Sequence, residues 1–197
     1  HSLWRVRATG AAGLVRLSDG CSENRWPGFS PKGEHIYYAS RPTALDGWQI
    51  WRIAVDGSLP MQLREGRRPR VSPDGSRIAY SLFDDVHGNW NIWIMNSDGT
   101  EQTQLTFDLE SNQIQPTWSP DGHRIVYASN SGKDSNGVKN YDIWVMDVDG
   151  ANATQLTTNG SDDLLPAYSP NGMYIYILSN RGHCWDIWRM TPTAGVR

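Results

Sequence analysis

The chain lacks the features that mark several large classes of protein. No apolar run approaches the roughly 18 residues of a membrane-spanning helix, and the first twenty residues lack the charged start and apolar centre of a signal peptide. The 18 Lys and Arg are outnumbered by 21 Asp and Glu, which gives a net charge of -3. This balance supplies no general field that attracts nucleic acid or an anionic membrane surface. We therefore expect neither nucleic-acid binding nor membrane insertion.

Cysteine is scarce, and the usual catalytic motifs are missing. The 197 residues include two cysteines, Cys21 and Cys184. A disulfide between them would tie the two ends of the chain together, but two free thiols are equally consistent with the sequence. No CxxC pair or paired Cys and His set offers a zinc site. No Gly-x-Ser-x-Gly elbow, glycine-rich phosphate loop or metal-binding triad is present. We expect no cofactor, no metal and no catalytic residues.

Helical periodicity is also missing, and a repeat stands in its place. No stretch of ten residues or more has apolar residues at helical spacing, so we expect almost no helix. The phrase QPTWSPDGHRIVYAS, residues 115–129, recurs three more times in similar form. The four turns begin at Ser30, Ser72, Ser119 and Ser169, in steps of 42, 47 and 50 residues. A repeat of this size indicates a solenoid, a propeller or an array.

Each repeat predicts four short strands. Ser-Pro-Asp-Gly favours a tight type I turn between the first two strands. The segment after the turn, for example residues 125–127, is rich in β-branched and aromatic residues. An Ile-Trp pair such as Ile143 and Trp144 marks the third strand, and an Asp-Gly hairpin signal leads to a fourth. The resulting sheet has two apolar faces, and stacking the sheets radially as blades would bury both.

We therefore predict an all-β fold, a single β-propeller of four-stranded antiparallel blades over residues 1–197. The chain holds about four to five blades' worth of repeats, with partial ones at 1–20 and 159–197 and complete ones at 21–63, 64–107 and 108–158. A β-sandwich is the alternative fold. A sandwich, however, does not require the same turn and the same Ile-Trp pair every 42–50 residues.

The repeat carries a family resemblance. It resembles the WD-like propeller repeat of the TolB family at Trp118, the Ser-Pro-Asp-Gly turn, and residues 124–127, 142–144, 149–150 and 155–157. The four in-register copies extend the resemblance over nearly the whole chain. The resemblance implies a propeller of six or a similar number of blades. Such propellers are found in bacterial periplasmic proteins and in prolyl-oligopeptidase-type peptidases, so an extracytoplasmic location is favoured.

The number of strands is smaller than the family's usual ring requires. The chain is a fragment of a larger propeller, closes with few blades, or completes a ring with another copy. If it closes alone, residues 14–17 would form the fourth strand of the last blade and leave residues 3–8 as a spare strand. An unpaired strand edge favours assembly or aggregation. We therefore favour a fragment or an oligomer over a closed monomer.

Four aromatic residues are the candidate binding residues on the variable face. The loops between the second and third strands differ in length, and loops on a rigid scaffold are where binding can vary. Each of these loops ends in an aromatic residue, at Trp48, Trp90, Tyr141 and Trp185. These rings offer stacking platforms for sugars, aromatic side chains or a partner peptide. The simpler interpretation is that each ring packs between blades and starts the third strand.

A shortened basic link supplies the other candidate residues. Ten or eleven residues separate the fourth-strand Leu from the next Pro in the other links, but only six do between Leu63 and Pro69. This link contains Arg67, Arg68 and Arg70, which could meet a carboxylate, a phosphate or an acidic segment of a partner. A solvated basic link is the alternative.

Two acidic pairs are interpreted as solvated loop charge. Asp84 and Asp85 lie near His87, and Asp162 and Asp163 lie in the last link. Adjacent loop carboxylates do not by themselves have the fixed separation and perturbed environment that acid or base catalysis needs.

The sequence thus favours a non-enzymatic, protein-binding or assembly scaffold that resembles TolB-type propellers. A protein partner or self-association is the expected interaction. The alternatives are a propeller that binds a carbohydrate or small ligand through its loop aromatics, and a propeller fragment of a prolyl-oligopeptidase-type hydrolase.

Overall fold

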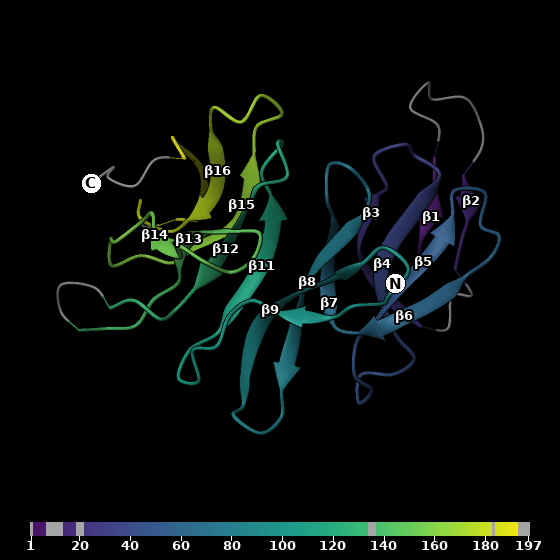
Figure 1. Cartoon of the computed structure of the whole chain (residues 1–197), viewed down its shortest axis with the longest axis horizontal. Helices are drawn as coiled ribbons and strands as arrows, with labels where there is room; N and C mark the ends of the chain where they lie inside the picture. Colours follow the sequence, from purple (N-terminus) through teal and green to yellow (C-terminus); the bar gives the residue numbers. More distant parts are fainter. Residues whose placement is uncertain (1, 7–13, 19–21, 134–136, 183, 193–197) are drawn as a thin grey trace.

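The repeated turn sequences divide the chain into a series of small antiparallel sheets (Figure 1). The computed structural model describes residues 2–6, 14–18, 22–133, 137–182 and 184–192, and every regular element in these ranges is a strand. In the same ranges, no helix is long and apolar enough to cross a membrane. The prediction of an all-β propeller is confirmed.

A two-stranded hairpin and four larger sheets follow one another along the chain. The leading hairpin pairs β1 (Trp4–Arg5) with β2 (Val15–Arg16). The first blade consists of β3 (Glu23–Phe29), β4 (His35–Arg41), β5 (Gln49–Ala54) and β6 (Met61–Glu65). The second consists of β7 (Arg67–Val71), β8 (Arg77–Asp84), β9 (Asn89–Asn96) and β10 (Thr103–Gln104).

The third blade consists of β11 (Gln113–Trp118), β12 (Arg124–Ser129), β13 (Asp142–Asp147) and β14 (Thr154–Gln155). The last sheet has three strands among the described residues, β15 (Asp163–Tyr168), β16 (Ile175–Ser179) and β17 (Asp186–Met190). In each of these four sheets the strands pair in chain order, and all pairs are antiparallel.

The Ser-Pro-Asp-Gly turn forms as predicted and is held by its own side chains. In the second blade the amide of Gly75 donates to the carbonyl of Ser72 at 2.9 Å. The hydroxyl of Ser72 accepts from the amide of Arg77 at 2.9 Å and donates to the carboxylate of Asp74 at 2.5 Å. These bonds satisfy the polar groups that the chain reversal would otherwise leave unpaired. The turn is therefore a scaffold feature.

The Asp-Gly turn of a blade packs closely against the sheet that precedes it. Gly150, at the turn between β13 and β14, has a φ of +88°. A Cβ on Gly150 would lie 2.9 Å from the carbonyl oxygen of Leu105 in the second blade. The equivalent Gly99 lies against Leu63 of the first blade. Glycine is needed there because the backbone is left-handed and the neighbouring blade approaches closely.

The core consists of apolar layers between successive sheets. One layer joins the first two blades through Ile50, Ile78, Tyr80 and Met95, all 1% exposed or less. Similar layers lie between the leading hairpin and the first blade, between the second and third blades, and between the third blade and the last sheet. Burial of both faces of each sheet is the stabilising principle of a propeller.

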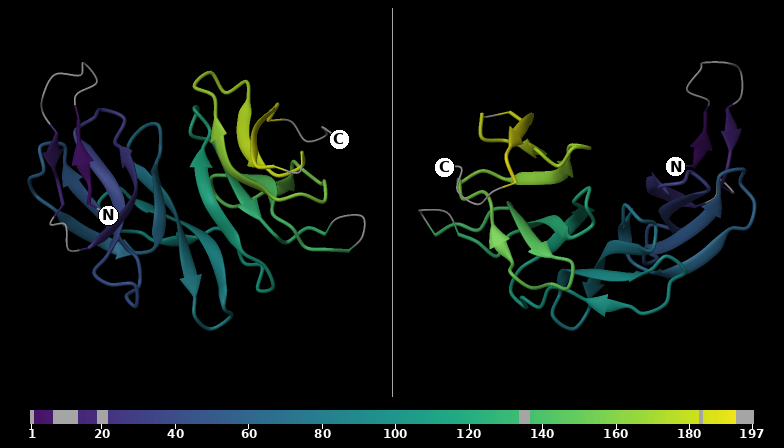
Figure 2. Two further views of the ribbon diagram at one scale, coloured as in Figure 1. Left: turned by 180° about the vertical axis from the view of Figure 1, so that it is seen from behind. Right: turned by 45° about the horizontal axis from the view of Figure 1, so that its top comes forward.

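The sheets follow an open arc, with the leading hairpin at one end and the last sheet at the other (Figure 2). The closed arrangement with few blades is wrong for the described residues, because β2 pairs with β1 and not with β17. In the first blade, β6 continues to Glu65, which pairs with Gln49. The link to the second blade is therefore Gly66 alone.

Among the described residues, no further sheet packs on the face of the last sheet that carries Ile187. Ile187 of β17 is 73% exposed, whereas Ile50, Ile92 and Ile143, which hold the same place in the three blades, are fully buried. Tyr176 on the same face is 40% exposed. In the blades this place is covered by the next sheet along the arc.

Candidate functional site

The first strand of each of the four sheets, which we call the inner strand, has a bulge at a residue that precedes proline. These strands are β3, β7, β11 and β15. Trp26, Arg68, Gln115 and Leu165 hold this position and have φ angles of +52° to +61°. The strand register shifts at the same place in all four sheets. A residue before proline ordinarily favours an extended backbone, so a left-handed conformation repeated four times is built into the fold. The equivalent bulge position therefore carries a different side chain in each of the four sheets.

The first of these bulge residues is part of a stack of rings and guanidinium groups. The ring centroids of Trp26 and Trp48 lie 4.8 Å apart at an interplanar angle of 51°. The guanidinium of Arg68 lies 4.8 Å from the centroid of Trp26, and that of Arg41 lies 4.6 Å from the centroid of Trp48. Each contact is of the cation–π or aromatic kind, so the stack fixes the orientation of both rings.

Arg67 makes a similar contact with an aromatic ring of the second blade. Its guanidinium carbon lies 3.3 Å from the ring centroid of Trp90, which also contacts Phe83 at 5.1 Å. Burial, and then the neighbouring positive charge of Arg68, lowers the pKa of Arg67 to about 10. The opposing influence comes from Tyr141. Arg67 is therefore charged at neutral pH, and two of the predicted aromatic residues lie beside it.

We call Trp26, Trp48, Arg67, Arg68 and Trp90 the arginine–aromatic surface. It combines residues of the first and second blades that the one-residue link at Gly66 brings close together.

The arginines of this region are not balanced by carboxylates. The ion pairs of the described residues do not include Arg67, Arg68 or Arg70, whereas Arg25 and Arg41 both pair with Glu23, at 2.5 and 2.6 Å. The buried Nε of Arg67 has no hydrogen-bond partner among the described residues. Partly buried positive charge without a carboxylate partner costs stability.

Arg68 and Arg70 line a pocket between the inner strands. The pocket has a volume of about 130 Å³ and is lined by Arg68, Arg70, Gln115 and Thr117 on its polar side and by Leu165 and Pro166 among its apolar residues. Burial and then the charges of Arg70 and Arg25 lower the pKa of Arg68, and burial lowers the pKa of Arg70. We call this the inner pocket.

The predicted aromatic residues also start the third strands. The amide of Trp90 donates to the side-chain oxygen of Asn112 at 3.1 Å, and the amide of Tyr141 donates to Asp162 at 2.9 Å. Trp185 is 49% exposed and directly precedes β17 of the last sheet, away from the arginine–aromatic surface. The structure therefore brings together Trp48 and Trp90 with the arginines, places Tyr141 beside them, and leaves Trp185 apart.

Trp26 is a member of this surface that sequence reasoning missed. It precedes Pro27, as Arg68 precedes Pro69. The signal was the repeated position before proline, occupied by a different residue type in each copy.

The fold can be compared with solved structures. No family model matches the chain. Over 75 residues it is 36% identical to an uncharacterized protein of Agrobacterium fabrum, a match spanning 37% of this chain and 23% of that protein. A TolB structure from Agrobacterium tumefaciens superposes with a TM-score of 0.81 at 22% identity, covering 99% of this chain and 72% of that one. TolB from Acinetobacter baumannii gives 0.80 at 18% identity, with 99% and 47% covered.

The chain has a TolB-like β-propeller fold. At these low sequence identities, the similarity to solved structures shows the fold alone. The chain spans less than half the length of the Acinetobacter protein. A puromycin-hydrolyzing peptidase of Mycobacterium tuberculosis is similar at a lower TM-score of 0.70 and 16% identity, with 93% of this chain and 33% of the peptidase covered.

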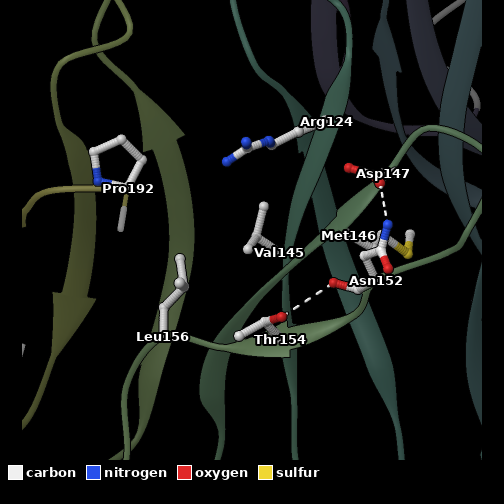
Figure 3. A pocket seen from close by; sticks show the side chains of 8 residues that line it. All are labelled: Arg124, Val145, Met146, Asp147, Asn152, Thr154, Leu156 and Pro192. Carbon is white, nitrogen blue, oxygen red and sulfur yellow. Dashed lines mark hydrogen bonds between the residues drawn. The ribbon is translucent and has the colours of Figure 1, made fainter. Parts of the chain in front are cut away.

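The other cavities of this TolB-like propeller belong to the blade boundaries. A pocket of about 420 Å³ lies between the third blade and the last sheet, and Arg124, Leu156 and Pro192 are among its lining residues (Figure 3). At the preceding boundaries an Asp-Gly turn packs on the fourth-strand leucine, whereas Pro192 accompanies Leu156 here. Two further grooves are lined by equivalent residues of the first and third blades, for example Trp51 and Trp144. Repetition along the arc marks the two grooves as scaffold features.

One interpretation of the acidic pairs is wrong. Asp163 is fully buried, because β15 places it against Arg181, whose guanidinium lies 2.7 Å from its carboxylate, and Asn159, which donates at 2.9 Å. Asp84 is the last residue of β8, and its partly exposed carboxylate pairs with His87 at 2.7 Å. Among the described residues no group of three or more His, Cys, Asp or Glu is placed to hold a metal ion. Cys184 is a free, exposed thiol, and Cys21 lies outside the described ranges.

Proposed function

We propose that the chain is a non-enzymatic binding module that holds a segment of a protein partner at its arginine–aromatic surface. The observation that carries this proposal is a group of arginines without carboxylate partners that stack on tryptophan rings. Arginine and tryptophan are the residue types that contribute most to protein interfaces. The complementary partner segment has carboxylates to pair with the arginines and apolar groups to cover the rings.

The proposal is tested by selecting peptides from a random library displayed on phage. We expect selected peptides to be rich in Asp and Glu and to bind the variant Arg67→Ala/Arg68→Ala at least about tenfold more weakly, since a hydrogen bond to a charged group contributes roughly 1.5–3 kcal/mol. Arg77→Ala is the matched control, because Arg77 is an exposed arginine at the start of β8. Selection of no peptide, or equal loss in both variants, would refute the proposal.

Binding of carbohydrate through open aromatic platforms is less well supported. The rings of Trp48 and Trp90 already contact Arg41 and Arg67 at 4.6 and 3.3 Å, so a sugar would have to displace these contacts or use the remaining exposed ring surface. A glycan array that gives no binding and leaves tryptophan fluorescence unchanged would remove this alternative.

A role as the propeller of a prolyl-oligopeptidase-type hydrolase is the other alternative, favoured by the similarity to peptidase structures. A hydrolase coding region adjoining that of this chain in the same gene would support it. Its absence from the intact gene would contradict it.

We further propose self-association through the face of the last sheet that carries Ile187. Within the chain, the equivalent isoleucines are covered by a following sheet, and the leading hairpin at the other end of the arc exposes Trp4 by 50% and Leu14 by 64%. A second copy can therefore place its leading hairpin against Ile187. Light scattering should give a mass above that of one chain, and Ile187→Lys should lower it to 22.2 kDa. A wild-type chain that is monomeric at all concentrations contradicts this.

We also propose an extracytoplasmic location, on the likeness to TolB proteins. Fractionation of the native organism with an antibody against this chain tests it, and recovery in the cytoplasmic fraction would refute it.

A further inference from the structure

The inner pocket has the chemistry of an anion site. Its guanidinium groups come from one strand, β7, and its remaining polar residues come from the neighbouring β11. Arg70 donates to the carbonyl of Pro69 at 3.3 Å, and no carboxylate lines the pocket. The charges that act on Arg68 are those of Arg70 and Arg25, both positive. A negatively charged group is therefore the missing counterpart.

The polar groups of the pocket are mainly hydrogen-bond donors. Gln115 uses its Oε1 to accept from the amide of Leu165 at 2.6 Å, and its Nε2 donates to none of the described residues. With the two guanidinium groups, this side-chain amide and the hydroxyl of Thr117 offer a small anion several donors at once. The bulge at Arg68 fixes the strand backbone in the unbound chain, so little reorganisation is needed on binding.

The size and walls of the pocket select among anions. A volume of about 130 Å³ is below the roughly 300–1,000 Å³ of sites for drug-sized ligands, so the pocket admits one functional group on a short stem. Leu165 and Pro166 supply apolar walls that would contact methylene groups. A carboxylate on an aliphatic stem matches both sides of the pocket, whereas inorganic phosphate has no apolar part to cover these walls.

We propose that the inner pocket binds a carboxylate of the partner segment, between the guanidinium groups of Arg68 and Arg70. This inference rests on the proposed function and adds the chemical group that the partner must supply. Two sources share this chemistry, an Asp or Glu side chain and the carboxyl terminus of a chain.

The chain itself supplies a matched variant. Gln115 and Thr117 hold the positions in the third blade that Arg68 and Arg70 hold in the second, and the φ of Gln115 is +61° against +54° for Arg68. The variant Arg68→Gln/Arg70→Thr therefore keeps residue types that the same bulge already accommodates. Arg77→Gln is the control for the loss of a positive charge elsewhere.

The test is a titration followed by NMR of the arginine Nε–Hε groups. N-acetylglutamate amide presents a side-chain carboxylate, N-acetylalanine presents a terminal one, N-acetylglutamine amide is the uncharged isostere, and inorganic phosphate is the competing anion. We expect one or both carboxylates to shift the signals of Arg68 and Arg70, and the more effective one identifies the source. The isostere should shift neither signal.

The variants decide the outcome. Arg68→Gln/Arg70→Thr should weaken carboxylate binding at least about tenfold, measured by the remaining amide shifts around Gln115, while Arg77→Gln should bind as the wild type does. Phosphate binding as tight as that of the carboxylates, no shift with any probe, or equal weakening in both variants would overturn the inference. Selected peptides that bind the arginine–aromatic surface without any carboxylate in this pocket would overturn it as well, yet leave the proposed function standing.

Discussion

Replacing Gly66 by Ala should destabilise the chain more than an ordinary glycine replacement does. Gly66 is the whole link between the first two blades, and its amide donates to the carbonyl of Trp48 at 2.8 Å. Its φ is +139°, a conformation that side-chain-bearing residues rarely adopt. A Cβ there would lie 2.7 Å from Cδ2 of Tyr80 and 3.1 Å from Cδ1 of Ile50, both fully buried.

The expected loss of stability has two parts. Holding alanine in this backbone conformation costs roughly 1–3 kcal/mol. Forcing a methyl group against the packed Tyr80 and Ile50 costs about 1–3 kcal/mol more, because neither side chain has free space to move into. We therefore expect Gly66→Ala to lower the free energy of unfolding by roughly 2–6 kcal/mol.

Urea denaturation followed by the fluorescence of the 10 tryptophans measures this difference. Gly88→Ala is the control, since Gly88 also has a left-handed φ, +71°, but a Cβ there would meet nothing within 4 Å. That variant should lose only about 1–2 kcal/mol. Equal losses in the two variants would refute the claim that the blades are packed around the one-residue link.

Two further predictions concern the buried acids between the third blade and the last sheet. Burial, with the nearby Asp163, raises the pKa of Asp142 from 3.8 to about 7, so the folded chain holds this proton above the pH at which the unfolded chain releases it. The free energy of unfolding should therefore fall as pH rises from about 4 to 7. Asp142→Asn, which copies Asn91 of the second blade, should stabilise the chain by roughly 2–4 kcal/mol at pH 8 and by little at pH 4. Thermal melts at both pH values check this, and a gain in stability that does not depend on pH would contradict it. Arg181→Met should lower the free energy of unfolding by roughly 3–5 kcal/mol in urea titrations, because it leaves Asp163 buried without its ion pair. Adding Asp163→Asn should restore much of the loss. No recovery in the double variant would contradict the ion-pair explanation.

The fold was largely predictable because its local signals and its period agree. Ser-Pro-Asp-Gly gives the turn from local chemistry, and the Ile-Trp pairs recur at the places where the third strands form. The termini of the array were less predictable, since whether β2 pairs with β1 or with the last sheet depends on the arc and not on local sequence. The structure resolves this in favour of β1.

The candidate site was only partly predictable. The short link pointed to Arg67, Arg68 and Arg70, but not to their surroundings. Sequence rules favour an extended backbone before proline, so they do not predict the bulges that bring Trp26 against Arg68.

Contacts between residues far apart in sequence were the main limit. Asp163 looked like a solvated loop residue because its partner Arg181 lies one strand away, in the loop after β16. The burial of an acid by such a partner depends on sheet register, which composition does not show.

The affinity of one selected peptide for three chains tests the central claim most directly. The claim is that unpaired arginines on a tryptophan surface bind a protein segment. The account predicts that Arg67→Ala/Arg68→Ala binds the peptide at least about tenfold more weakly than the wild type, while Arg77→Ala binds it equally well. Equal affinity of all three chains would contradict the account.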